Sequence, residues 1–150
     1  MQFEKKASKL KKLNPDNKTD FQLISRIVSK RAPLSNILDV KESEDLLMFY
    51  VLIALKNELY YLEELDVIVL MEQEGTDLYV LDILSTKTRC GGSSKLSFYQ
   101  KIETIHLLFT PEKSKYIDAA YIIETEDMLF VRPNVLTSEN YFLFPATSHA

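Results

Sequence analysis

Residues 89 to 94 read Arg-Cys-Gly-Gly-Ser-Ser and hold two of the three glycines of the chain and its only cysteine. Backbone N–H groups at the start of a helix bind phosphate, and glycine lets the phosphate come close to the backbone. The GxGxxG and P-loop motifs are absent, which leaves Arg89-x-x-Gly92-x-Ser94 as the pattern. On these residues alone, a flexible connection is the simpler interpretation, and a phosphate-binding loop is the alternative.

Carboxylates at two other places are candidates for proton transfer. Glu63 and Glu64 follow the segment YYL, where two predicted strands meet, so they either act as a general base or form a solvated turn. Asp82 lies inside the apolar segment LYVLDIL. We expect it to point to the open face of the sheet; the alternative is burial beside a partner of opposite charge.

The cysteine and the two histidines give weaker indications of a functional site. Cys90 has Arg89 beside it, which favours a thiolate, but no neighbouring residue supplies a base, so we interpret it as a bystander. His106 lies in the segment TIHLLF and is expected to be a strand residue satisfied by a hydrogen bond, and His149 is the penultimate residue. No His, Cys or acidic residues have metal-ligand spacing, so the sequence predicts no metal site.

The length and the net charge of the chain limit the number of domains and the classes of binding partner that are possible. The chain has 150 residues, of which 46% are hydrophobic and 27% charged, so we expect a single folded domain over residues 1–150. The net charge of −4 argues against nucleic-acid binding, which depends on Lys and Arg. A basic run lies within residues 1–13, which we interpret as a solvated tail or linker.

The same sequence predicts a cytoplasmic location. A single cysteine cannot form an internal disulfide, and no signal-peptide pattern is present at the N-terminus. The longest apolar run, residues 46–55, is far shorter than the roughly 20 residues that cross a bilayer. We therefore expect no membrane association, and we interpret this run as a buried helix.

The elements that would position these residues begin with two helices. Asn17 is a suitable N-cap for a first helix that buries Phe21, Ile24, Ile27 and Val28 and ends before Pro33. Ser43 can cap a second helix, which covers the apolar run, packs on more than one side and ends near residue 57.

Strands follow the helices. The segment ELYYLEE and residues 66–73 and 77–84 are predicted strands, with the last two in a hairpin. A helix at residues 96–102 and a strand at 104–109 then form a right-handed crossover, which makes the last two strands parallel. The segments AAYIIET, DMLFVRP and YFLF supply further short strands.

This order of elements resembles the GNAT superfamily of acyl-CoA N-acyltransferases. The family has a Gln/Arg-x-x-Gly-x-Gly/Ala loop after its fourth strand, which wraps the pyrophosphate of coenzyme A. The pantetheine arm lies where the fourth and fifth strands splay apart. Arg89 and Gly92 match the loop, and Ser94 stands where Gly or Ala is expected. The resemblance implies an α/β (α+β) fold: a mixed, mostly antiparallel sheet of about 6–7 strands with a central parallel pair, flanked by helices.

A second resemblance covers nearly the whole chain. The segments KLKKLNPDNKTDFQLI, LYYLEELDVIVLMEQEG, HLLFTPE and FLFPATSHA look like the C-terminal half of a longer group of bacterial GNAT-type proteins. In that group, the preceding half carries the better acyl-CoA motif. This implies either a small GNAT-like enzyme or a degenerate half.

The resemblance implies an N-acetyltransferase that uses acetyl-CoA or another acyl-CoA and acts on a small-molecule or peptide amine. Glu63 or Glu64 would be the base and Tyr116 the acid. The cofactor would contact Ile83, Leu84, Ser85, Arg89, Gly91, Gly92, Ser93 and Ser94. The alternative is a non-catalytic half that binds the acceptor and pairs with a second GNAT half or as a homodimer.

Overall fold

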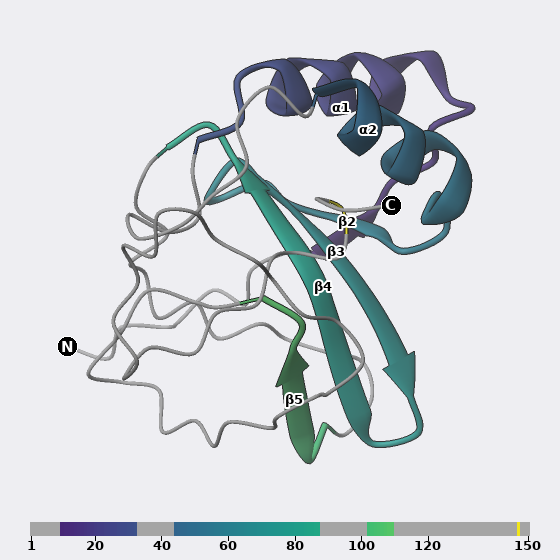
Figure 1. Ribbon diagram of the computed structural model, residues 1–150, viewed down its shortest axis with the longest axis vertical. Coiled ribbons are helices and arrows are strands. Elements are labelled where there is room, and N and C mark those ends of the chain that lie inside the picture. Colours follow the sequence, from purple (N-terminus) through teal and green to yellow (C-terminus); the bar gives the residue numbers. More distant parts are fainter. Residues whose placement is uncertain (1–9, 33–43, 88–101, 110–146, 148–150) are drawn as a thin grey trace, which may run out of the picture.

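A computed structural model describes residues 10–32, 44–87, 102–109 and 147 (Figure 1). These residues form an α+β fold in which one five-stranded, mostly antiparallel sheet carries helices on one face. The elements in chain order are β1 (Leu10–Lys12), α1 (Lys18–Ser29), α2 (Glu44–Phe49), the π-helical segment η1 (Tyr50–Ala54), β2 (Leu59–Leu62), β3 (Val67–Glu74), β4 (Asp77–Ser85) and β5 (Thr104–Leu107).

The first helix begins where the sequence predicts. The Asn17 side chain accepts hydrogen bonds from the backbone N–H groups of Thr19 and Asp20, so it caps α1. Ile24, Ile27 and Val28 are buried against the sheet, which confirms the predicted face. Phe21 differs: its side chain is 40% exposed, because it lies at the border of that face rather than on it.

The second helix is shorter and more exposed than the sequence predicts. After Phe49 the hydrogen bonding widens, and the N–H of Leu55 donates to the Tyr50 carbonyl at 2.7 Å. Only one residue in each part, Leu47 in α2 and Val51 in η1, is buried. The expectation of packing on several sides is wrong for the described residues, because Phe49 and Ile53 are 51% and 65% exposed.

The sheet has the strand order β1-β2-β3-β4-β5. The pairs from β1 to β4 are antiparallel, which confirms the predicted β3–β4 hairpin, and β4 and β5 are parallel as expected. The hairpin turn contains Gly75 with a φ of 61°, a conformation that glycine adopts without steric cost. The described residues hold five strands; the further strands expected after residue 109 and the helix at residues 96–102 lie outside them.

The lysine-rich start of the chain is partly a strand. Leu10 pairs with Leu62, and Leu13 is 2% exposed in the core. Lys11 Nζ lies 2.6 Å from Asp20 Oδ1, which ties β1 to the start of α1. The interpretation as a tail or linker is therefore wrong for residues 10–13, because two leucines anchor them; residues 1–9 lie outside the described chain.

Two apolar clusters fill the two faces of the sheet. The cluster under the helices joins α1, α2 and η1 to the sheet through side chains that include Ile27, Leu47, Ile68 and Leu84. The cluster on the opposite face includes Val69, Leu78, Val80 and Phe109. Among the described residues, no helix has both the length and the apolar character needed to cross a membrane.

Candidate functional site

The candidate site is the end of the sheet at which β4 stops. Here β4 extends beyond its parallel neighbour: the β4–β5 register ends at Val80 and Leu107, and one more hydrogen bond joins Leu108 N–H to the Val80 carbonyl at 2.9 Å. Residues 81–85 of β4 therefore have no β5 partner within the described part of the chain. The pairing stops here because β5 ends at Leu107, whereas β4 continues to Ser85.

A β-bulge lies at the same point of β4. Leu70 pairs with Asp82 and Met71 with Val80, which leaves Leu81 as an extra residue. Leu78 and Val80 face the cluster away from the helices, whereas Leu84 faces the cluster beneath them. The bulge interrupts the alternation of side chains between the two faces of the sheet and turns the Asp82 side chain towards the helices. β-Bulges commonly redirect a side chain in this way.

Asp82 is fully buried, with 0% exposure. Its Oδ1 accepts hydrogen bonds from Arg31 Nη2 at 3.2 Å and from the Ile83 N–H at 2.7 Å, and its Oδ2 accepts one from the Thr147 hydroxyl. The expectation that Asp82 points to the open face is wrong. The other alternative, burial beside a partner of opposite charge, describes the structure, since Arg31 lies just after α1 and its side chain is only 10% exposed.

Two buried nitrogens of Arg31, Nε and Nη1, have no hydrogen-bond partner within the described chain. A buried donor without a partner costs roughly 1–3 kcal/mol. Such a group in a folded protein calls for an acceptor that the described residues do not supply: an ordered water, a ligand oxygen or a residue outside the described chain. Nothing in the sequence pointed to Arg31 beyond its residue type.

The expected pantetheine-binding residues lie along this edge, but two of their polar groups already have partners. The Ile83 N–H donates to Asp82, as above, and the Ser85 carbonyl accepts from the Ala32 N–H at 2.7 Å. The Leu84 side chain is 0% exposed in the core. A pantetheine arm beside residues 83–85 therefore cannot form hydrogen bonds to all of their backbone groups, as it could along an unoccupied strand edge.

Glu63 and Glu64 lie in the turn between β2 and β3, at the same end of the sheet, and both are exposed. Backbone hydrogen bonds from Leu65 to Leu62 and from Asp66 to Glu63 hold the turn. The structure therefore brings them to the candidate site. However, β3 separates β2 from β4, which at about 4.8 Å per strand places them roughly 10 Å away. Proton transfer across that gap requires bridging water.

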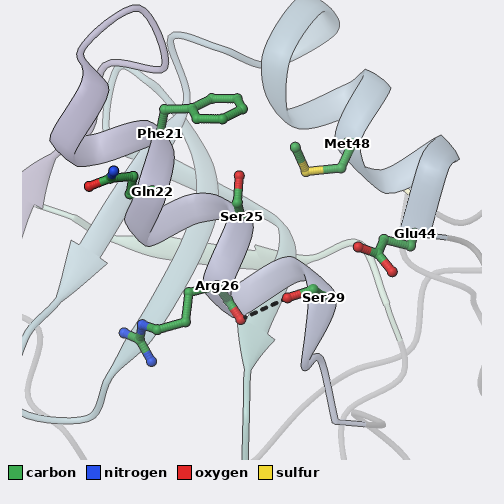
Figure 2. A pocket seen from close by; sticks show the side chains of 7 residues that line it. All are labelled: Phe21, Gln22, Ser25, Arg26, Ser29, Glu44 and Met48. Carbon is green, nitrogen blue, oxygen red and sulfur yellow. Dashed lines mark hydrogen bonds between the residues drawn. The ribbon is translucent and has the colours of Figure 1, made fainter.

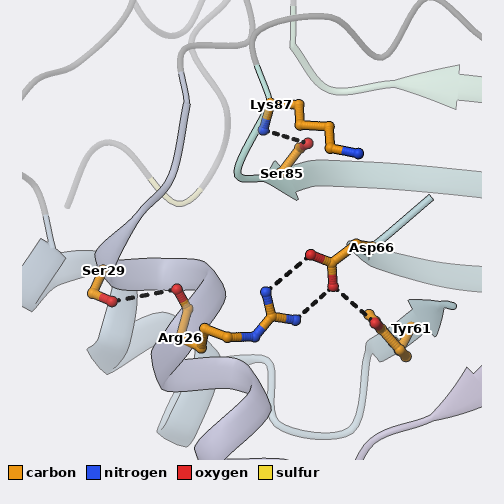
Figure 3. A network of polar contacts seen from close by, with 6 residues as sticks. All are labelled: Arg26, Ser29, Tyr61, Asp66, Ser85 and Lys87. Carbon is orange, nitrogen blue, oxygen red and sulfur yellow. Dashed lines mark hydrogen bonds and ion pairs between the residues drawn. The ribbon is translucent and has the colours of Figure 1, made fainter.

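A polar network beside the turn was not anticipated from the sequence (Figure 3). Arg26 Nη1 and Nη2 donate to Asp66 Oδ2 and Oδ1 at 2.9 and 2.5 Å, and the Tyr61 hydroxyl donates to Oδ1 at 2.8 Å. The hydrogen bond from Arg26 lowers the pKa of Asp66 to about 2. Burial, followed by the bond to Asp66, raises the pKa of Tyr61. The network fastens α1 to the sheet.

A shallow, open groove of 460 Å³ runs between α1 and α2 (Figure 2). Phe21 from α1 and Met48 from α2 supply its apolar surface. Its polar lining includes Ser25, Arg26 and Glu44. Arg26 also lines the groove, but Figure 2 shows its guanidinium group directed away from Phe21, Met48 and Glu44.

His106 is a β5 residue, as predicted, and its ring stacks on Tyr79 with centroids 4.5 Å apart. The expected hydrogen bond is absent at Nε2, which lies 3.8 Å from Asp77 Oδ2 and has no hydrogen-bond partner in the described residues. The described residues contain no group of three His, Cys, Asp or Glu side chains arranged to hold a metal ion.

The other expected site residues lie outside the described chain. They are the predicted acid and the glycine loop with its cysteine: Tyr116, Arg89, Cys90, Gly91, Gly92, Ser93 and Ser94. His149 lies outside it as well. No family model matches the chain, and neither a curated protein nor a solved structure matches it.

Proposed function

We propose that this chain is a GNAT-like domain that binds acetyl-CoA or another acyl-CoA and transfers its acyl group to an amine. The observation that carries the proposal is the stretch of β4 after Val80 that extends beyond the end of β5, next to a β-bulge. In the GNAT superfamily the acyl-pantetheine arm lies between these two strands. The order β1, two helices, an antiparallel meander and a parallel strand supports the same proposal.

In the proposed reaction, the amine nitrogen attacks the thioester carbonyl carbon and the carbon–sulfur bond breaks. Glu63 or Glu64 takes the amine proton through water, since both are separated from β4 by one strand. Tyr116 gives a proton to the departing thiolate. The loop of Arg89, Gly91, Gly92, Ser93 and Ser94 holds the pyrophosphate.

The groove between α1 and α2 is the proposed site of the acceptor. It combines an apolar surface, from Phe21 and Met48, with the carboxylate of Glu44. A carboxylate beside apolar side chains favours an ammonium group attached to a hydrocarbon chain. The acceptor class is accordingly an aliphatic amine, either free or at the end of a lysine side chain.

Titration with acetyl-CoA tests the cofactor assignment directly. Saturation at a hundredfold excess over the dissociation constant raises the stability by about 2.7 kcal/mol, which a melting curve detects. The amide resonances of residues 81–85 are expected to move at the same time. If millimolar acetyl-CoA changes neither the melting temperature nor these resonances, the proposal is wrong.

The second candidate function is a non-catalytic interaction module, either one half of a tandem GNAT protein or a homodimer. One observation favours it: the Ile83 N–H and the Ser85 carbonyl already have partners inside the chain. This candidate predicts a dimer in sedimentation and no response to acetyl-CoA. The variant Ser94→Gly, which restores the family residue, would then also fail to bind.

A further inference from the structure

The stretch of β4 beyond β5 is the edge on which an acyl-CoA arm would lie, and the chain itself supplies part of its hydrogen bonding. The segment after α1 runs past the end of β4 (Figure 1), where the Ala32 N–H donates to the Ser85 carbonyl at 2.7 Å. Asp82 accepts the Ile83 N–H at 2.7 Å. A ligand amide carbonyl at this edge therefore cannot rely on the Ile83 N–H.

Arg31 places other donors beside the same edge. Its Nη2 donates to Asp82 at 3.2 Å, which fixes the guanidinium next to residue 82. Its Nε and Nη1 are buried and have no acceptor within the described residues. These are strong donors, because hydrogen bonds from a charged group are about twice as strong as neutral ones.

Charge decides which acceptor suits this position. Asp82 is 0% exposed and balances the positive charge of Arg31. A phosphate or carboxylate added here would place a second negative charge beside the buried carboxylate of Asp82, which is costly. A neutral carbonyl oxygen adds an acceptor without adding charge, so it fits the unpartnered nitrogens.

We infer that Arg31 donates a hydrogen bond to an amide carbonyl oxygen of the pantetheine arm. In this role it takes the place of the Ile83 backbone N–H, which already donates to Asp82. This inference rests on the proposed function, since it needs an acyl-CoA at the end of β4. It makes Arg31 a cofactor-binding residue and Asp82 the residue that positions it. The bulge at Leu81 is what brings Asp82 to the correct face of β4.

Calorimetric titration with two fragments of coenzyme A tests the inference. Pantetheine represents the arm, and 3′-phospho-ADP represents the nucleotide. Arg31→Gln is expected to weaken the binding of acetyl-CoA and of pantetheine by about ten- to a hundredfold. The affinity for 3′-phospho-ADP is expected to stay at the wild-type value. The matched control is Lys30→Gln, which removes an exposed positive charge one residue away and leaves all three affinities near wild type.

The outcomes separate the two proposals. If the wild type binds acetyl-CoA and Arg31→Gln binds it equally well, the inference is overturned and the proposed function stands. If Arg31→Gln weakens the binding of pantetheine and of 3′-phospho-ADP equally, the inference is also overturned, because Arg31 would then affect the whole site. If the wild type binds no acetyl-CoA, the proposed function and the inference both fail.

A measurement on the unaltered chain covers the case in which Arg31→Gln does not fold. The Nε–H resonance of Arg31 is expected to shift when pantetheine is added, because the donor gains a carbonyl acceptor. The Nε–H resonance of Arg26, which bonds to Asp66 through Nη1 and Nη2, serves as the internal reference. An Arg31 resonance that stays still while pantetheine binds means that the pantetheine arm does not bond to Arg31, and the inference is wrong.

Discussion

Arg31 Nη2 and Asp82 Oδ1 lie 3.2 Å apart and form an ion pair between the segment that follows α1 and the bulge of β4. Water cannot hydrate either charge well, since the side chains of Arg31 and Asp82 are 10% and 0% exposed, respectively. Removing one member of a buried pair leaves an uncompensated charge, which is far more harmful than replacing both members. The pair therefore links the proposed cofactor site to the stability of the domain.

We expect Asp82→Asn to lower the free energy of unfolding by about 3 kcal/mol, the lower end of the usual cost of breaking a buried pair. The double variant Arg31→Met with Asp82→Leu is expected to recover most of this loss, because it removes both charges. Urea denaturation measures both. Asp77→Asn is the control on the same strand, since the Asp77 side chain is 40% exposed. A loss below 1 kcal/mol for Asp82→Asn would contradict the prediction.

The β3–β4 turn gives a second prediction. Gly75 has a φ of 61°, and a Cβ atom added there would meet nothing within 4 Å. Any cost of Gly75→Ala therefore comes from backbone conformation alone, about 1–2 kcal/mol for a residue forced into the left-handed region. Gly75→Asn should cost less, because asparagine tolerates this region. Equal unfolding free energies for the two variants would show that the turn changes conformation instead.

Local signals in the sequence predicted the first helix and the hairpin. Asn17 and the spacing of Ile24, Ile27 and Val28 define α1 within a few residues, and the turn at Gly75 defines the register of β3 and β4. Both depend on interactions between residues close in the sequence, which is why the pattern alone was sufficient.

The environment of Asp82 could not be predicted in the same way. Strict alternation along β4 assigns Asp82 to the face of Leu78 and Val80, and only the extra residue at Leu81 changes this. Its partner Arg31 is fifty-one residues away and carries no motif. The strand β1 was not predicted for a related reason. The lysines around Leu10 obscured the strand pattern, and β1 forms because it pairs with the edge of β2.

The N-cap of α1 gives a third prediction. Asn17 Oδ1 accepts from Thr19 N–H at 2.9 Å and from Asp20 N–H at 3.4 Å. Asn17→Ala removes this acceptor and is expected to lower the unfolding free energy by about 1 kcal/mol. Asn17→Asp keeps an acceptor and should remain near wild type. Thermal denaturation of both variants checks this, and an unchanged melting temperature for Asn17→Ala would be evidence against the cap.

The fourth prediction concerns acid stability and depends on Asp66. The hydrogen bond from Arg26 lowers the pKa of Asp66 from 3.8 to about 2 in the folded state. A carboxyl group whose pKa is lower in the folded state stabilises the fold above its unfolded pKa, and this contribution disappears as the pH falls through about 2. The free energy of unfolding should therefore decline between pH 4 and pH 2.

Asp66→Asn isolates this contribution. Asp66 has a φ of 55°, which asparagine tolerates, so the variant removes the charge without adding backbone strain. Wild type is expected to be more stable than Asp66→Asn at pH 6, by about 1 kcal/mol for a partly exposed ion pair. The difference should shrink towards zero near pH 2. Urea denaturation at each pH measures it, and a difference that stays constant from pH 6 to pH 2 would show that the Asp66 carboxyl does not titrate as proposed.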